Sequence, residues 1–214
     1  MTLTTRGESR PVIGPFALAL LALLLPARAG MAQTPTVTGS ATALQATVIG
    51  LIGGTTTALA DTGPLVDDGD ARAAELASGS IALVGNANVL HAVTLSAIES
   101  WSPGDEVASE SSLTELALSI AGSTISAGFA MAQASAPVGG APVSWSTIEG
   151  LSVNGVPIAV TGAPNQTVSL PGLTLVLNEV QDTATSVTVN ALHLASSLDG
   201  TDVVVASATA GIGP

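Results

Sequence analysis

Apolar residues alternate with polar or very small ones through most of this chain, and this pattern restricts the fold more than any other feature. In residues 89–96, for example, Leu90 and Ala92 fall opposite Val89 and His91. A two-residue period rich in valine, threonine and isoleucine indicates β-strands, and segments such as NANV, SPGDE and VNGVP are typical of turns between them. We predict strands in residues 42–48, 89–96, 113–120, 125–132, 151–160, 168–180, 187–196 and 203–208.

Strict alternation also predicts which side chains share a face of each strand. It places Leu44 on the opposite face from Ala43. It groups Ile125 with Phe129 on one face of the strand and puts Ala130 on the other.

The fold class that follows is all-β: a single β-sandwich-like domain of about eight to twelve strands. Many strands are apolar or small on both faces, which suits sheets covered on both sides. A β-solenoid is the alternative, because the segments GNANVLHAVTLSA and AGSTISAGFAMAQ are weakly similar. The similarity does not recur at a fixed period, as solenoid repeats do, and this favours the sandwich.

Other segments interrupt the strand pattern. The segment DDGDARAAELA, residues 67–77, predicts at most one short helix, with its acidic residues in the first turn. About half of the acidic residues outside the N-terminal segment lie in residues 62–77 and 102–112, and we expect these two segments to be exposed connections. Residues 33–38, QTPTVT, have the composition of a leader before the first strand.

The N-terminal segment has the layout of a secretory signal peptide. Arg6 and Arg10 precede the apolar run VIGPFALALLALLL, which is short for a membrane span, and small residues suited to cleavage follow Pro26. An uncleaved N-terminal anchor is the alternative. We expect a cleaved signal peptide in residues 1–32, an exported all-β domain in residues 33–214, and secretion or a place at the cell surface.

Charge and cysteine content limit the partners of this domain. Residues 33–214 hold fifteen acidic residues against Arg72 as the sole lysine or arginine, a net charge of about −14. Nucleic acids and anionic membrane surfaces are bound through lysine and arginine, so neither is an expected partner. No cysteine is present, so the core must stabilise the fold without disulfides. Partners in keeping with export are the cell wall, an extracellular matrix or a second copy of the chain.

The segment LPGLTLVLNEVQDTATSVTVNALHL, residues 170–194, contains most of the polar side chains that suggest a site. Two alternating runs flank a polar turn, as in a β-hairpin, with Glu179 near the turn. Asn190 and His193 are an odd number of residues apart, so strict alternation places them on opposite faces of one strand. We therefore interpret these residues as the polar surface of a hairpin, and we expect His91 and His193 to bond to backbone carbonyl groups. A zinc site built across strands from the two histidines is the alternative.

The acidic segment VDDGDA is the strongest candidate for ion binding. Asp67, Asp68 and Asp70 surround Gly69 and offer the hard oxygen ligands that calcium prefers. Their spacing differs from that of an EF-hand loop, and an exposed acidic loop is the alternative. No other cofactor is expected.

Catalytic signatures are absent from the sequence, and aromatic residues are rare. The string TISAG lacks the first glycine of a serine-hydrolase elbow, and sugar-cleaving sites normally combine paired carboxylates with aromatic residues. Phe129, Trp101 and Trp145 are the only aromatic residues after the N-terminal segment. We expect both tryptophans to fill the core, and exposed binding residues are the alternative.

Several segments, in their order along the chain, resemble the choice-of-anchor P family of exported bacterial proteins. They are ATALQATVIGLIG, LALSIAGSTISAGFAMAQASA, IEGLSVNGVPIAV, PNQTVSLPGLTLVLNE, SVTVNALHL and DGTDVVVASATAGI. The resemblance spans roughly residues 38–209 and is strongest after Ile148. It implies an exported, surface-associated β domain, and none of its motifs is catalytic.

The expected function is therefore that of a non-enzymatic structural or adhesive domain at the cell surface or in the extracellular matrix. Two alternatives remain open at this point. One is a secreted hydrolase whose site combines a histidine with carboxylates such as Glu149 and Glu179, and the other is a β protein that binds calcium, ice or a mineral surface.

Overall fold

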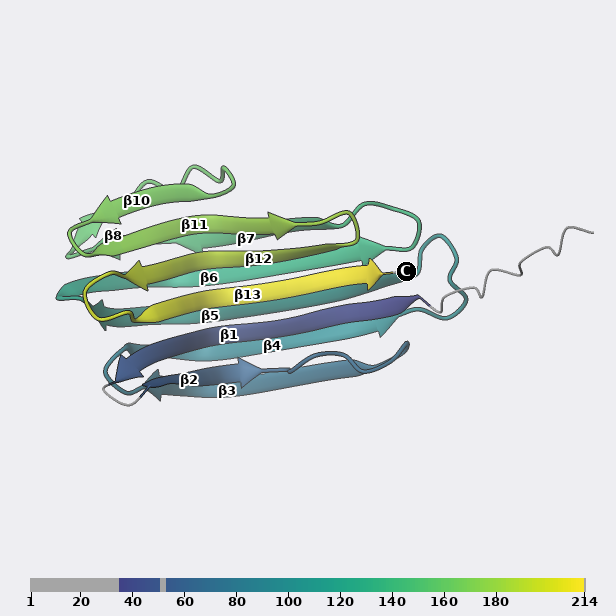
Figure 1. Cartoon of the computed structure of the whole chain (residues 1–214), viewed down its shortest axis with the longest axis horizontal. Coiled ribbons are helices and arrows are strands. Elements are labelled where there is room, and N and C mark those ends of the chain that lie inside the picture. Colours follow the sequence, from purple (N-terminus) through teal and green to yellow (C-terminus); the bar gives the residue numbers. More distant parts are fainter. Residues whose placement is uncertain (1–34, 51–52, 214) are drawn as a thin grey trace, which may run out of the picture. The chain divides into compact units, whose positions relative to one another are not determined.

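The computed structural model describes residues 35–50 and 53–213, and within these ranges the chain consists of antiparallel β-strands without any helix (Figure 1). The predicted signal peptide lies outside the described residues, and no helix in the described part is long and apolar enough to cross a membrane. In this described part of the chain, thirteen strands form two sheets, and two of the strands, β8 and β9, are only two residues long. All of them belong to one compact unit, residues 33–214.

The first sheet has six strands in the order β10-β11-β12-β13-β1-β2. The second has the order β3-β4-β5-β6-β8-β9, with β7 also paired to β6. The strands of the first sheet are β1 (Thr36–Gly50), β2 (Gly53–Asp61), β10 (Gln166–Leu170), β11 (Leu173–Asp182), β12 (Ser186–Ser196) and β13 (Asp202–Gly213). Those of the second are β3 (Ala71–Ile81), β4 (Gly85–Ala97), β5 (Glu106–Ile120), β6 (Ser123–Pro137), β7 (Val143–Glu149), β8 (Ser152–Val153) and β9 (Val156–Pro157).

The two sheets pack face to face around one apolar core, so the predicted sandwich is confirmed and the solenoid is wrong. Leucines such as Leu44, Leu113 and Leu192 fill one part of this core. Alanines of β1, β6 and β13 fill another part, where the side chains between the sheets are very small.

Serine side chains of β5 bond directly to the opposite sheet in this small-residue region. The Ser109 hydroxyl donates to the backbone carbonyl of Thr209 at 2.6 Å, and the Ser111 hydroxyl donates to that of Ser207 at 2.9 Å. A serine extends only one atom beyond Cβ, so the two backbones lie closer here than the roughly 10 Å typical of stacked sheets. Gly39 fits the same close approach, since a Cβ there would lie 2.5 Å from side-chain atoms of Leu65 and Thr94.

The inside–outside alternation reverses once along the long strands. In β1, every second residue is buried in the stretch that ends with Ala41 and Ala43. The next buried residues are Leu44 and Ala46, so the buried positions shift by one residue between Ala43 and Leu44. In the first sheet, the strands from β2 to β11 all reverse at the same level. The residues before this level and the residues after it pair with neighbouring strands in the same register. We call this level the reversal row; in the first sheet it consists of Ala60, Ala43, Ala206, Ala191 and Asn178.

On every second strand of the first sheet, the residue in the reversal row has a left-handed backbone conformation. The φ angle is 48° at Ala60, 48° at Ala206 and 49° at Asn178. The second sheet has a comparable level, where φ is 44° at Val89 and 49° at Glu115. This conformation costs an L-residue other than glycine roughly 1–2 kcal/mol, so the surrounding sheet must enforce it.

The reversal corrects two of the predicted faces. Ala43 and Leu44 are both buried, although strict alternation places them on opposite sides. In β6, Ile125 faces the core before Gly128, and Ala130 faces it afterwards, while Phe129 is only partly buried. The predicted face grouping is therefore right on one side of the reversal and wrong on the other.

Several predicted boundaries are also wrong. Residues 71–77 belong to strand β3 and not to a helix, because pairing with β4 overrides their helical propensity. Strand β5 begins at Glu106, within the segment expected to be a connection, and β1 begins at Thr36, within the expected leader. The strand predicted for residues 168–180 is a tight hairpin of β10 and β11, and residues 151–160 hold only β8 and β9.

Val89 offers a direct test of the backbone strain. A β-branched residue is strongly disfavoured at positive φ, whereas asparagine tolerates that conformation. Val89 is 62% exposed, so Val89→Asn loses little apolar burial and is expected to raise the free energy of unfolding by about 1 kcal/mol. Urea denaturation measures the change. The matched control is Val93→Asn in the same strand, which is expected to destabilise; a Val89→Asn variant that destabilises equally contradicts the assignment of strain.

Candidate functional site

Four polar side chains form a connected group on the outer face of the first sheet. We call this group the His193 cluster; it consists of Glu179 of β11, Asn190 and His193 of β12, and Asp202 of β13. The Nδ1 atom of His193 lies 3.0 Å from a carboxylate oxygen of Glu179, and its Nε2 atom lies 2.8 Å from Oδ2 of Asp202. The Asn190 amide donates to Oε2 of Glu179 at 2.6 Å. Glu179 therefore joins Asn190 to His193.

The reversal row creates this cluster. Ala191 and Leu192 are both buried, so the residues on either side of them, Asn190 and His193, project to the same face. The prediction that Asn190 and His193 lie on opposite faces is therefore wrong. The hairpin pairing itself is confirmed, since Glu179 lies opposite Asn190 in the β11–β12 register.

The histidines bind carboxylates and not the backbone carbonyl groups that were predicted. His193 lies between Glu179 and Asp202, and Nδ1 of His91 lies 3.1 Å from Oε1 of Glu75 on the neighbouring strand β3. In both cases the carboxylate comes from a neighbouring strand and is more than four residues away in sequence, so a search of nearby positions does not find it.

The cluster stabilises the charged form of each partner. Burial lowers the pKa of His193, but the hydrogen bonds and negative charges of Asp202 and Glu179 raise it by more, so the pKa lies above the ordinary 6.5. Burial raises the pKa of Glu179, but Asn190 and His193 lower it by more, and the pKa falls below 4.5. The protonated ring donates from both nitrogens to carboxylates, so it has no free nitrogen with which to accept a proton from a substrate.

The His193 cluster does not have the arrangement of a metal site. Its ring separates the two carboxylates, whereas metal ligands converge on one point. Within residues 35–50 and 53–213, no group of three or more histidine, aspartate or glutamate side chains is placed to hold a metal ion.

The predicted calcium ligands are not brought together either. Oδ2 of Asp70 accepts hydrogen bonds from the Val66 backbone amide and from Nε of Arg72, each at 3.0 Å. Asp67 and Asp68 are exposed on the connection before β3. Calcium binding by Asp67, Asp68 and Asp70 stays a prediction that this geometry does not support.

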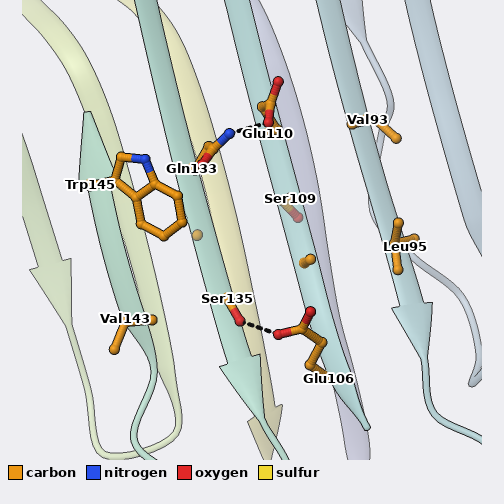
Figure 2. A pocket seen from close by; sticks show the side chains of 11 residues that line it. Val93, Leu95, Glu106, Ser109, Glu110, Gln133, Ser135, Val143 and Trp145 are labelled. Atoms are coloured by element: carbon orange, nitrogen blue, oxygen red, sulfur yellow. Dashed lines mark hydrogen bonds between the residues drawn. The ribbon is translucent and has the colours of Figure 1, made fainter. Parts of the chain in front are cut away.

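A hollow of about 470 Å³ lies on the outer face of the second sheet (Figure 2). Two rows of side chains run across strands β4, β5, β6 and β7 and line it. The first row, in strand order, is Val93, Glu110, Gln133 and Trp145, and the second is Leu95, Ala108, Ser135 and Val143. Larger side chains surround Ala108 and Ser135, so these two small residues form the floor of the hollow.

Two carboxylates stand at opposite ends of this hollow. Glu106 accepts a hydrogen bond from the Ser135 hydroxyl at 2.6 Å, and Glu110 accepts one from the Gln133 amide. Both pairs are drawn in Figure 2, with the indole of Trp145 beside Gln133. Neighbouring side chains thus hold both carboxylates in place.

Trp145 lies on the surface, so the prediction that it fills the core is wrong. The residue is 50% exposed and forms one wall of the hollow with Val143. Trp101 is partly buried and packs against the core, which agrees with its prediction.

Glu106 and Glu110 were not predicted as site residues, because they lie in the segment that was expected to be an acidic connection. A signal was present: Glu106, Ala108 and Glu110 alternate with the buried residues Val107 and Ser109, which continues the pattern of β5 toward its start. The concentration of acidic residues concealed this alternation.

The fold and these sites define the class of protein. It is an all-β sandwich with a polar cluster on one outer face and a tryptophan-lined hollow on the other. No protein-family model matches the chain, and no curated protein or solved structure matches it either. The predicted resemblance to the choice-of-anchor P family therefore stays a prediction.

The His193 cluster predicts how stability depends on pH. The contribution of His193 to the free energy of unfolding is complete below pH 6.5 and is lost as pH rises through its raised pKa. The contribution of Glu179 is present above pH 4.5 and is lost as pH falls through its lowered pKa. His193→Gln is therefore expected to lower the free energy of unfolding by about 1–2 kcal/mol at pH 5.5 and by clearly less at pH 9.

Urea unfolding of the wild type and the variant at both pH values measures this difference. His91→Gln is the matched control, because its Glu75 partner is largely exposed and an exposed ion pair contributes little. A His193→Gln effect of equal size at the two pH values contradicts the proposed role of the protonated ring.

Proposed function

We propose that this chain is a non-enzymatic, exported β-sandwich domain with a structural or adhesive role at the cell surface or in an extracellular matrix. The single observation that carries the proposal is the half-exposed Trp145 in a hollow on an open sheet face. Exposed aromatic side chains with a polar surround are typical of surfaces that bind other molecules.

The chemistry of the polar side chains supports binding over catalysis. Both nitrogens of His193 face carboxylates, so this ring is not free to activate a nucleophile. The Ser109 and Ser111 hydroxyls donate to backbone carbonyls between the sheets. Glu149, which a histidine–carboxylate hydrolase site was expected to include, is an exposed residue of β7 in the other sheet from Glu179.

The N-terminal segment and the charge support the proposed location. Residues 1–32 have the pattern of a secretory signal, and the resemblance to the choice-of-anchor P family implies surface association. The acidic domain that remains suits partners at the cell wall, in a matrix or in a second copy of the chain, and it disfavours nucleic acids and insertion into a membrane.

Fractionation of the native host tests the proposal. Medium, envelope and cytosol are separated, and mass spectrometry determines the N-terminus of the protein in each fraction, with a cytosolic enzyme as the control for lysis. We expect the protein in the envelope or matrix fraction, beginning near Gly30 or Gln33. Recovery only as free monomer in the medium contradicts surface retention, and an intact Met1 in the cytosol contradicts export.

A further inference from the structure

The hollow on the second sheet has an unbalanced charge. Glu106 and Glu110 line it, and none of its lining residues is basic. Arg72 is the sole arginine or lysine in the described part of the chain, and it pairs with Asp70 outside the hollow. The whole sequence carries a formal charge of −12. Electrostatic complementarity therefore favours a positively charged occupant.

The hollow also has a long apolar surface between its two carboxylates. Glu106 and Glu110 are four residues apart in one strand, which places their Cα atoms about 13 Å apart. Ala108 lies midway between them, with Leu95 beside it on one side and, beyond Ser135, Val143 on the other side of the same row. A ligand that fits needs an apolar stem that covers Ala108 and a polar end that reaches a carboxylate.

Trp145 adds a preference for a cation. Its indole stands in the same row as Glu110, with Gln133 between them, so a basic segment that crosses this row passes both the indole and the carboxylate (Figure 2). Cations bind the face of tryptophan better than that of other aromatic residues, and arginine side chains do so most often.

We propose that this hollow binds arginine or lysine side chains of a basic segment in a partner polypeptide. The side-chain stem packs on Ala108, and the cationic end pairs either with Glu110, on the side of the hollow where Trp145 stands, or with Glu106 at the other end. The inference rests on the proposed function, and it specifies the partner: an extended basic strand or tail that crosses β4, β5, β6 and β7. A neutral saccharide uses the tryptophan face but leaves the two carboxylates without a charge partner.

The expected affinity for one basic segment is modest, because the hollow is open to solvent. A solvent-exposed cation–π contact and a rim ion pair each change the dissociation constant by only about two- to fivefold. Many copies of the domain on one surface raise the effective affinity for a partner with repeated basic segments. This behaviour suits reversible adhesion.

Isothermal titration of the intact protein measures the binding. The probe is a capped hexapeptide of alternating arginine and glycine, and the matched probe replaces each arginine with glutamine. We expect the arginine peptide to bind at 50 mM salt, with affinity reduced at least about fivefold at 500 mM salt because the charges are screened. The glutamine peptide is expected to show no binding.

Three variants assign the binding to the hollow. Trp145→Ala is expected to weaken the arginine peptide about fivefold, Glu110→Gln about threefold, and Ala108→Leu more than tenfold, because leucine fills the floor. All three sites face outward, and urea unfolding checks that each variant is folded. Glu75→Gln is the matched control: it removes the same charge from the same sheet face, outside the hollow, and is expected to leave binding within about twofold.

Three results overturn the inference. One is equal binding of the arginine and glutamine peptides. Another is an equal loss of affinity for the arginine peptide in Glu75→Gln and Glu110→Gln, because net charge alone then explains the binding. The third is salt-independent binding of a neutral glucan oligosaccharide that is lost in Trp145→Ala, which reassigns the hollow to sugars. Failure of the peptide test leaves the fractionation result untouched, so the inference and the proposed function fail separately.

Discussion

Left-handed backbone at one level of each sheet determines which side of the long strands faces the core. On one side of Ala206, the buried residues of β13 are Val203 and Val205; on the other side they are Ala208 and Ala210. In the first sheet, neighbouring strands reverse at the same level and keep their register, and both halves of each strand bury apolar side chains. In the second sheet, the register between β4 and β5 shifts near Val89. The positive φ angles cost energy, and this cooperative burial offsets the cost.

The same constraint connects the core to both outer faces. Because Asn190 and His193 emerge on one side of β12, Glu179 contacts both of them. In the part of β5 that precedes Glu115, Ser109 and Ser111 face the other sheet. Glu106, Ala108 and Glu110 consequently face outward, where they line the hollow.

The thin region between the sheets depends on residue size. With only three aromatic residues after the N-terminal segment, the core is filled by aliphatic side chains, many of them alanine. Alanine and glycine let the sheets approach until serine hydroxyls reach the carbonyl groups of the opposite strand. These bonds satisfy hydroxyls that are otherwise costly to bury. Close approach in turn leaves little room for an aromatic side chain between the sheets, which agrees with Trp145 on the outside.

The sequence allowed the existence of most strands and the sandwich class to be predicted, because alternation and turn residues are local signals. It did not allow the reversal to be predicted. Glycine and asparagine are the usual signals of left-handed backbone, but Ala60, Val89, Glu115 and Ala206 adopt it here because the sheet around them enforces it.

The candidate sites were predictable to different degrees. The pairing of Glu179 with the strand of His193 followed from the hairpin pattern, whereas the shared face of Asn190 and His193 required the reversal. The hollow depends on cross-strand register between residues as distant as Val93 and Trp145. Alternation determines a face but not which residues of non-adjacent strands lie side by side.

Cysteine labelling tests the reversal most directly, since the chain contains no cysteine of its own. Thr188→Cys and Ala195→Cys are seven residues apart in β12, and the reversal at Ala191 places both on the outer face. The account predicts that both thiols react with a soluble maleimide in the folded protein, while Val189→Cys, which faces the core, reacts only as fast as the protein unfolds. Protection of either Thr188→Cys or Ala195→Cys to the level of Val189→Cys means that β12 alternates without interruption, and it contradicts the account.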